Sequence, residues 1–325
     1  MKRSISIVVL ILIAGLIAWQ VWSDAVESGG KGKERSAGVP LGDAVPAVQI
    51  IARRNADAAV APTNSDSIDQ ILFGDLHVHS TYSTDAFLWA LPLNHGKGVH
   101  PVADACDYAR YCSAIDFWSI TDHAEATTPL RWQRAKDAIR QCQAKSVDQS
   151  NPDLVSMLGF EWTQVGTIPS EHFGHKNVIF LGLDDDEVAA RPIAARGVAT
   201  DALRSNTPSL PAIIPLSDFK NRDVYYDINT FFRNISATPD CDPDLPSSQL
   251  PPDCFESAKY PEDLIARLHD QGLDPLIIPH GSSWGYYTPP GTTWDKQLAA
   301  RHQPELFRLI EIYSGHGNSE EYRDY

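Results

Sequence analysis

Two histidines one residue apart, in the string Asp75-Leu-His77-Val-His79-Ser80, have the spacing of ligands to a single cation. Side chains at positions i and i+2 of a β-strand point to the same face, so His77 and His79 at a strand end can bind one metal ion together. Asp85 follows closely and offers a carboxylate. Eleven histidines in 325 residues can also produce such a pair by chance, so the other candidates decide its meaning.

Further imidazoles and carboxylates recur where predicted strands begin or end. Asp122 and His123 end the second predicted strand, Glu161 lies near the end of the third, His175 immediately precedes the fourth, and His280 ends the fifth. In parallel barrels the functional groups gather at the carboxyl ends of the strands. Histidines scattered through a core would not recur at strand ends in this way, so the set predicts a metal site.

Two carboxylates have expected roles in this site. A carboxylate can bridge two cations and an imidazole cannot, so Glu161 is the expected bridging ligand. Asp122 is expected to accept a hydrogen bond from a metal-bound histidine such as His123 and to fix its tautomer. The alternative for Asp122 is a polar turn residue at a strand end. Glu161 and Asp122 are the predicted catalytic residues.

The chain that must position these side chains alternates short apolar runs with helical patterns. The predicted strands are 71–78, 117–120, 154–162, 177–181, 275–278 and 306–313, and the predicted helices are 101–112, 130–145 and 261–271. This alternation is typical of parallel strands with helical crossovers and indicates an α/β barrel. Residues 184–260 form a long insertion with a predicted helix at 221–234, and such insertions often shape a substrate pocket.

The N-terminus carries an uncharged apolar run from Ser4 to Trp22, preceded by Lys2 and Arg3. Its length is close to the roughly 20 residues that span a bilayer as a helix, and a good signal-peptidase site does not follow it. We predict an inner-membrane anchor over residues 1–23 with the remaining chain in the periplasm, or a secreted protein if the segment is cleaved. The alternative is a buried core helix.

Residues 24–67 are rich in Gly, Ala, Ser, Asp and Pro and lack sustained periodicity. This composition predicts a flexible linker, and the folded domain is predicted over residues 68–325. The formal charge is -15 without a basic block, so nucleic acid is not an expected partner. Small anionic substrates remain compatible, because several divalent cations reverse the local field.

Five cysteines are compatible with an oxidising compartment. Cys241 and Cys254 flank a loop rich in Pro, Asp and Ser, where a disulfide would compensate for a small core, and we predict that they are bridged. A second bridge is predicted between Cys112 and Cys142. The alternative is that these two and Cys106 are small buried apolar side chains.

The motifs resemble those of the polymerase-and-histidinol-phosphatase (PHP) superfamily. They are Gly74-Asp-Leu-His-Val-His-Ser-Thr-Tyr-Ser-Thr-Asp85, Ile120-Thr-Asp-His123, Gly159-Phe-Glu161 and Pro279-His280. More narrowly, the chain resembles PHP-like proteins of the domain-of-unknown-function family 3604, through Asp116-Phe-Trp-Ser-Ile-Thr-Asp-His-Ala-Glu125, Glu161-Trp-Thr-Gln164 and Gly174-His-Lys-Asn177. The resemblance extends from about residue 72 to the end.

This resemblance implies a distorted seven-stranded (β/α) barrel that binds two or three divalent ions (Zn, Mn or Fe) and hydrolyses phosphate esters. It implies three ligand sets that share one glutamate: His77, His79 and Glu161; Asp85 and His123; Glu161, His175 and His280. His172 is an alternative to His175. Glu311, in Glu311-Ile-Tyr-Ser, resembles a family position on a late strand and receives no role.

Family members complete the site with an Asp-x-His near the C-terminal end, and no such tripeptide follows His280 here. The resemblance therefore implies an incomplete barrel, a fragment that lacks its last units, in which only the third ligand set is complete.

For the full-length protein, the expected function is a membrane-anchored metal-dependent hydrolase of a small molecule, most simply a phosphoesterase acting through metal-bound hydroxide. Two alternatives remain open. One is a metal-dependent amide or ester hydrolase. The other is a non-catalytic envelope binding module with structural metals, whose exposed aromatic residues would be Trp284, Tyr286, Tyr287 and Trp294.

Overall fold

The computed structural model describes most of the predicted domain. The described residues are 32–42, 71–205, 210–211, 213–282, 288–293, 307–315 and 317–318, with the single positions Ile13, Gly15, Leu16, Trp19, Val48 and Ala52. Apart from those single positions and residues 32–42, the predicted anchor (1–23) and linker (24–67) lie outside the described residues. Within the described ranges, no helix has the length and apolar character needed to cross a membrane.

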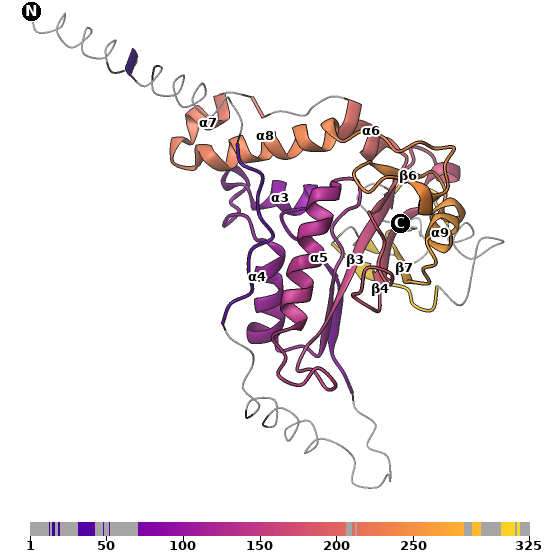
Figure 1. Ribbon diagram of the computed structural model, residues 1–325. Coiled ribbons are helices and arrows are strands. Elements are labelled where there is room, and N and C mark those ends of the chain that lie inside the picture. The colour runs from indigo at the N-terminus through magenta and orange to yellow at the C-terminus, as the bar shows by residue number, and fades with distance from the viewer. Residues whose placement is uncertain are drawn as a thin grey trace, which may run out of the picture.

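A five-stranded sheet, curled into half a barrel, forms the centre of the domain (Figure 1). In spatial order its strands are β1 (Gly74–Val78), β2 (Phe117–Ile120), β3 (Val155–Gln164), β4 (Gly174–Phe180) and β7 (Leu276–His280). The first three strands are parallel. β4 is antiparallel to both β3 and β7, so β7 runs in the same direction as the first three. The mixed α/β class is confirmed.

The direction of β4 corrects the prediction that all strands are parallel. Residues 165–173 join β3 to β4 with only the short 3-10 helix η3 (Pro169–Glu171), whereas a parallel connection needs a crossover of about a dozen residues or more. β4 also begins at Gly174, earlier than the predicted start at residue 177, so His175 lies inside the strand. Because β4 is reversed, its amino end lies at the carboxyl edge of the other strands.

Two helical segments cover one face of the sheet (Figure 1). They are α4 (Val102–Asp107), which continues into the π-helix η2 (Tyr108–Cys112), and α5 (Pro129–Gln143). Trp132 of α5 packs on Phe160 of β3, with ring centroids 5.9 Å apart, within the main core. Successive strand residues point to opposite faces, so Phe160 and Trp162 face the helices while Glu161 faces away from them.

The other elements lie after β1, in the insertion and before β7. They are α3 (Thr84–Ala90), η1 (Pro92–Asn94), β5 (Ile193–Ala195), α6 (Val198–Ser205), α7 (Ile213–Ser217), η4 (Phe219–Asn221), α8 (Arg222–Ala237), η5 (Ser247–Gln249), β6 (Glu256–Ala258) and α9 (Pro261–Asp270). β5 and β6 form a separate parallel pair. α8 and α9 confirm the helices predicted at 221–234 and 261–271.

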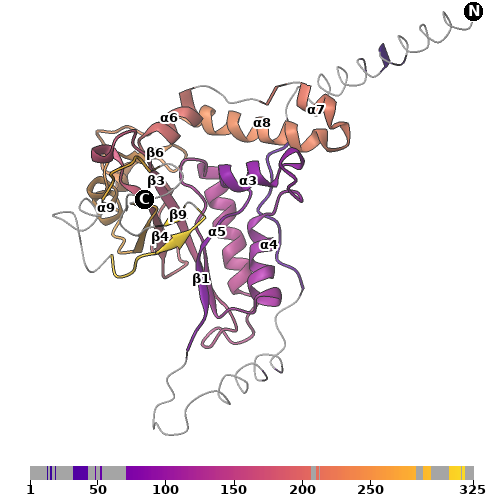
Figure 2. The same cartoon turned by 180° about the vertical axis from the view of Figure 1, so that it is seen from behind.

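Helix α8 lies beside the carboxyl edge of β1 to β3, over α3 (Figures 1 and 2). Its buried side chains Tyr225 and Phe231 join a second core with Phe87 of α3 and Ala126, which follows β2. The rings of Phe87 and Phe231 meet edge to face, with centroids 5.2 Å apart. The insertion therefore packs on the segments that follow β1 and β2, where the sequence places metal ligands.

The strand predicted over residues 306–313 is largely absent from the described residues. Residues 307–312 form no strand, and β8 (Tyr313–Ser314) pairs only with β9 (Gly317–Asn318). One backbone hydrogen bond, from Glu311 N to Pro279 O at 3.2 Å, attaches this segment to β7. That bond places Glu311 beside the end of β7 without a strand ladder.

Residues 32–42, which we call the strap, lie within the predicted flexible linker but pack along the domain. Ala37 is buried, and its carbonyl accepts a hydrogen bond from Ala103 N at 2.9 Å. Glu34 pairs with the buried Arg131 of α5 at 2.6 Å. In Figure 1 the strap is the indigo trace beside α4. This part of the linker thus has fixed contacts with the domain.

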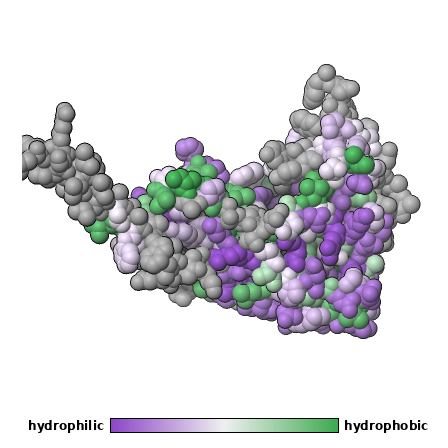
Figure 3. Space-filling view, turned by 90° about the horizontal axis from the view of Figure 1, so that it is seen from above, coloured by the Kyte–Doolittle hydropathy of each residue, from purple (hydrophilic) through white to green (hydrophobic). Residues whose placement is uncertain are grey.

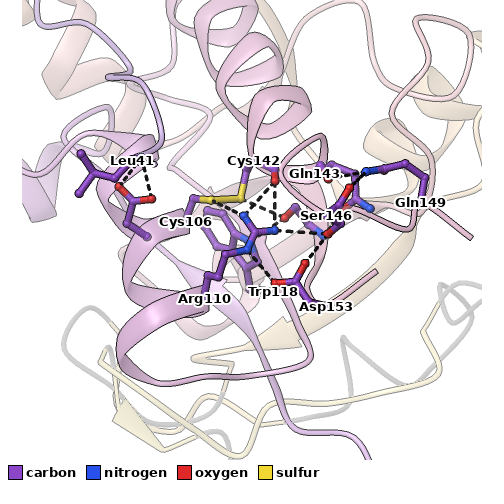
Figure 4. Close-up of a disulfide and its surroundings, with 11 residues drawn as sticks. Leu41, Cys106, Arg110, Trp118, Cys142, Gln143, Ser146, Gln149 and Asp153 are labelled. Carbon is purple, nitrogen blue, oxygen red and sulfur yellow. Dashed lines mark hydrogen bonds and ion pairs between the residues drawn. A yellow bond between two sulfur atoms is a disulfide. The ribbon is translucent and has the colours of Figure 1, made fainter. Parts of the chain in front are cut away.

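Two disulfides are present among the described residues. Cys241 and Cys254 are bridged as predicted. The predicted bridge between Cys112 and Cys142 is wrong, because Cys142 of α5 bonds to Cys106 of α4 (Figure 4). Cys106 is buried on the face of α4 that packs on α5, whereas Cys112 is exposed at the end of η2 and forms no disulfide.

Candidate metal centre

The predicted ligands meet because they occupy neighbouring positions on adjacent strands. His123 forms a parallel bridge to Glu161 just beyond β2. On the other side of β3, Thr163 lies opposite His175, and His175 in turn lies opposite His280. Directly opposed strand residues have Cβ atoms about 4.5–5.5 Å apart. The reversed direction of β4 is what brings His175 into this row from the start of its strand.

His77, within β1, and His79, just beyond it, join the row from the other side. His77 Nε2 and His79 Nε2 lie 3.0 Å apart. Both nitrogens face the same oxygen of Glu161, Oε2, at 3.3 Å for His77 and 2.9 Å for His79. The structure thus gives the pair the convergent geometry expected from its i, i+2 spacing.

Glu161 is the centre of the arrangement, and its side chain is 0% exposed. Besides the nitrogens of His77 and His79, Oε2 also faces His123 Nδ1, at 3.4 Å. The other oxygen, Oε1, lies 2.5 Å from His175 Nδ1 and 3.1 Å from His280 Nε2. One buried carboxylate therefore faces five imidazoles with both of its oxygens, as a bridging ligand must.

Asp85 extends the site onto helix α3, where it lies in the first turn. Its Oδ1 is 3.3 Å from His79 Nδ1 and its Oδ2 is 3.4 Å from His123 Nε2. Ser83, the residue before the helix, places its hydroxyl 2.9 Å from His79 Nδ1. Asp85 thus joins His79 to His123.

Among the described residues, four groups of three side chains hold one ligand atom each within 4.8 Å of one another and could bind metal ions. The groups are His77, His79 and Glu161; His79, Asp85 and His123; His123, Glu161 and His175; His77, His280 and Glu311. The structure brings together all seven predicted metal ligands. In the expected third set, His175 and His280 both face Oε1 of Glu161, but His175 groups with His123 and His280 groups with Glu311.

Asp122 differs from the other predicted site residues in what it binds. Its Oδ1 accepts a hydrogen bond from Ser80 N at 2.6 Å, and its Oδ2 accepts one from Ser80 Oγ at 2.7 Å. It belongs to none of the four groups among the described residues. The carboxylate therefore anchors the turn that follows His79, which matches the turn alternative better than contact with a metal-bound imidazole.

His172, the alternative to His175, is buried outside these groups. Its Nε2 lies 3.2 Å from Gly281 O and its Nδ1 accepts a hydrogen bond from Gly166 N at 3.5 Å. The ring ties the loop before β4 to the segment after β7. The geometry favours His175 as the ligand.

Two side chains at the centre received no role from the sequence. Glu311 Oε2 lies 2.8 Å from His77 Nδ1 and 3.6 Å from His280 Nδ1. Thr163 Oγ1 lies 2.7 Å from His123 Nδ1 and 3.3 Å from His175 Nδ1. The signal for Thr163 was its position two residues after Glu161, on the same face of β3. Glu311 lies in a segment that was predicted as a strand but forms none over residues 307–312, and only its resemblance to a family position singled it out.

Thr163→Val keeps the shape of the side chain and removes the hydroxyl that contacts His123 and His175. We expect metal affinity to fall about 10-fold, because groups that orient metal ligands contribute at this level. Isothermal titration with Zn²⁺ measures the change. Thr200→Val is the matched control, since Thr200 is also buried but bonds Ala195 O. Equal affinities for Thr163→Val and the wild type would show that the hydroxyl does not position the ligands.

Glu125 connects the centre to the insertion. One oxygen accepts hydrogen bonds from Thr163 N at 3.0 Å and Ala195 N at 2.8 Å, which joins β3 to β5. Burial raises the pKa of Glu125 to about 7, although the charge of nearby His123 works in the opposite direction. The carboxyl thus fixes the strand end on which Thr163 lies.

The protonation of the metal-free centre follows from the crowding of its groups. Burial lowers the pKa of His77, but hydrogen bonds to Glu161 and Glu311 outweigh it and raise the pKa to about 9. Burial alone would raise the pKa of Glu161, but His123, His280 and His175 together hold this pKa well below the usual range. The carboxylates therefore stay ionised, and protons on imidazoles balance their charge.

The imidazoles do not all hold a proton equally. Burial lowers the pKa of His175 to about 3, against the attraction of Glu161, and burial also lowers the pKa of His280. For His79, contacts with Asp85 and Glu161 outweigh burial and raise the pKa. The site thus combines neutral imidazoles, ionised carboxylates and a few imidazolium protons that a divalent cation can displace.

Metal affinity is expected to rise with pH. A metal binds the deprotonated imidazole, and the pKa of His77 is about 9, so a metal ion that binds His77 must displace a proton at neutral pH. Between pH 6 and 8 the affinity should increase about tenfold per pH unit for each proton released. Competition with a chromogenic chelator at three pH values measures this slope. A flat profile, corrected for the chelator, would mean that His77 is not a ligand.

Fold and site define an α/β protein with a candidate centre for divalent metals at the carboxyl edge of a half-barrel. Among known families, residues 66–152 match one described as "Protein of unknown function (DUF3604)". No curated protein and no solved structure matches the chain. The matched segment runs from before β1 to just beyond α5 and contains His77, His79, Asp85 and His123. It supports the resemblance to this family over that part of the chain.

Proposed function

We propose that this chain is a PHP-type, metal-dependent hydrolase, most simply a phosphoesterase, anchored in the inner membrane with its domain in the periplasm. The observation that carries the proposal is Glu161, which is fully buried and faces five histidines with its two oxygens. Burying such a cluster of carboxylate and imidazoles does not by itself stabilise the fold, because a buried carboxylate costs free energy unless it is compensated.

The donor set fits divalent transition metals. Imidazole nitrogen and carboxylate oxygen are ligands of Zn, Mn and Fe. With neutral imidazoles, Glu161, Asp85 and Glu311 carry three negative charges, which offset most of the charge of two divalent cations (+4) and half of the charge of three (+6). The ligand side chains are also open on one side, since Asp85 is 26% exposed and Glu311 is 23% exposed while Glu161 is 0% exposed. A catalytic metal site needs such an open position.

The residues of the chain perform the orienting work. Bound cations would lower the pKa of a coordinated water and polarise the oxygens of a phosphate or acyl group. Glu311 contacts His77 Nδ1, which directs the opposite nitrogen, Nε2, toward Glu161. This is the carboxylate–histidine arrangement that fixes a tautomer for metal binding. It is the role that the sequence suggested for Asp122.

Hydrolysis by the full chain tests the proposal. The chain, loaded with Zn²⁺, Mn²⁺ or Fe²⁺ in detergent, is assayed on phosphomonoesters and phosphodiesters, and separately on amides and carboxylic esters. We expect release of phosphate or alcohol from phosphoesters, lost on chelation. Cleavage of amides or carboxylic esters alone would replace the phosphoesterase by the second kind of hydrolase. Full metal loading without any cleavage would contradict catalysis.

No observation in the described part of the chain supports the binding-module alternative. Its aromatic residues, Trp284, Tyr286, Tyr287 and Trp294, lie outside the described residues.

A further inference from the structure

The strap begins on helix α8. Lys33 N donates a hydrogen bond to Asp227 Oδ1 at 2.5 Å, and the side chain of Arg35 forms an ion pair with the same carboxylate. Thr230 Oγ1 donates to Gly32 O at 2.9 Å. These contacts lie on two successive turns of α8. The ion pair of Glu34 with Arg131 of α5 is a further contact. The start of the strap is therefore held by several independent polar contacts.

The strap then runs from one end of the domain to the other. Its far end contacts the opposite end of the helices, where Leu41 N bonds both oxygens of Asp107 at 3.0 Å and Lys145, just beyond α5, bonds Gly42 O. β1 enters the sheet from that far end (Figures 1 and 2). Within the described residues, the chain thus meets the domain first at α8, beside the carboxyl edge that carries the candidate metal ligands.

This path changes how far the domain can lie from a membrane anchor. A chain spans at most about 3.3–3.6 Å per residue. Between the end of the predicted anchor at residue 23 and the start of the strap at Gly32, the reach is about 30 Å. If the domain were held only at Gly74, the reach would be about 170 Å, with the metal edge at the end remote from the attachment. The strap therefore shortens the tether between anchor and domain. It also places the α8 end of the domain near the anchor, in place of the end at which β1 enters the sheet.

The end held near the anchor carries exposed apolar side chains. Ile213 and Leu216 of α7 are 67% and 44% exposed, and Phe219 of η4 is 40% exposed. The guanidinium of Arg222 lies 4.2 Å from the centre of the Phe219 ring, and Lys220 is exposed next to it. Apolar and aromatic side chains next to Lys and Arg are typical of surfaces that rest in a membrane interface.

One more apolar side chain adjoins this group, and another is exposed on α3. Leu93 is 44% exposed, and its backbone hydrogen-bonds the hydroxyl of Tyr225, which in turn donates to Asp218 Oδ2 at 2.6 Å. Trp89, on α3, is 66% exposed. Figure 3, which looks down on this end, shows apolar side chains gathered on the left, the side on which α7 lies in Figure 1.

We propose that the strap holds the α7–α8 end against the lipid bilayer, with Ile213, Leu216 and Phe219 at the interface, so that the metal edge works close to the membrane surface. This inference rests on the proposed membrane anchor and is independent of catalysis. The occupant is a lipid bilayer, because the predicted anchor and the short reach to Gly32 bring this end to one.

Spin labels on the full chain in phospholipid vesicles test the proposal. With Cys112→Ser as background, since Cys112 is the exposed free thiol, a nitroxide is placed at Leu216 or Phe219 by substitution with cysteine. Collision with oxygen, relative to a water-soluble nickel complex, reports depth. At both positions we expect collision with oxygen to exceed collision with the nickel complex at least threefold. Leu181, which is 74% exposed at the end of β4 remote from the metal edge, is the control and should behave as in water.

The strap is tested separately with Asp227→Ala, which removes the acceptor for Lys33 and Arg35. We expect the label at Leu216 to return to aqueous behaviour, whereas Asp223→Ala, an exposed carboxylate on the same helix, should leave it in the interface. Aqueous labels at Leu216 and Phe219 on vesicle-bound wild type would overturn the docking. An unchanged depth in Asp227→Ala would overturn the role of the strap. Failure of the chain to sediment with vesicles would overturn the anchor as well, and hydrolysis would remain to be judged by its own assay.

Discussion

Glu161→Gln is expected to abolish tight metal binding and to lower hydrolysis by at least about 100-fold. The amide has nearly the shape of the carboxylate but carries no charge, so it cannot bridge cations. The substitution also removes the charge that, with Glu311, raises the pKa of His77 to about 9. Elemental analysis after dialysis and the hydrolysis assay measure the two effects.

The control for this substitution is Glu256→Gln. Glu256 is also 0% exposed, but it pairs with Arg191 of the insertion at 2.8 Å and with Arg267 of α9 at 3.1 Å. Breaking a buried ion pair from one side destabilises a protein by about 3–5 kcal/mol, so this variant should lose stability and keep its metals. If Glu161→Gln bound metal as tightly as the wild type, the centre would not be the metal site.

Replacing both Cys106 and Cys142 by Ser is expected to lower the free energy of unfolding by about 4 kcal/mol. The bridge joins residues 36 positions apart, and a closed loop of this size restricts the unfolded chain strongly. The bridge also lies in a polar network, because Arg110 donates to Cys142 O at 3.2 Å and pairs with Asp153 at 2.9 Å (Figure 4). Urea unfolding followed by tryptophan fluorescence measures the loss.

The second disulfide provides the comparison. Cys241 and Cys254 are only 13 positions apart, so the same argument gives about 3 kcal/mol for their double Ser variant. The order of the two losses is the informative result. A loss below about 1 kcal/mol for the Cys106 and Cys142 pair would show that α4 and α5 are held by packing rather than by the bridge.

The candidate ligands on or next to regular strands could be predicted because two simple rules apply to them. Alternation places His77 and His79 on one face, and parallel strands bring their carboxyl ends to one edge, where Glu161 and His280 lie. These rules use only local sequence. They also explain why a ligand such as Glu161 was identified without knowledge of the tertiary fold.

The remaining features depend on choices that local patterns do not make. The position of His175 before its predicted strand was a sign of the reversed β4, but only the short connection from β3 shows the reversal. Glu311 approaches His77 from a segment that was predicted as a strand but forms none over residues 307–312. The contacts of the strap are single side chains such as Glu34, spaced without any period, so composition alone predicted a flexible chain.

The choice between Cys106 and Cys112 had a partial signal. Val102, Cys106 and Ala109 follow the helical spacing of a buried stripe, which favours Cys106 as the partner of Cys142. The prediction treated residues 101–112 as one α-helix. The change to π-helical geometry over Tyr108–Cys112 alters the direction of the last turn, and Cys112 is exposed there.

The central claim is that side chains distant in sequence converge to bind divalent cations at one edge of the half-barrel. Crystals of the full domain grown with Zn²⁺ or Mn²⁺, measured on both sides of the metal absorption edge, locate the ions directly. Anomalous peaks are expected within bonding distance of Glu161, with ligands from His77 or His79 on one side and His123 or His175 on the other. Peaks confined to other surface sites, with the space around Glu161 free of metal at millimolar concentration, would contradict the claim.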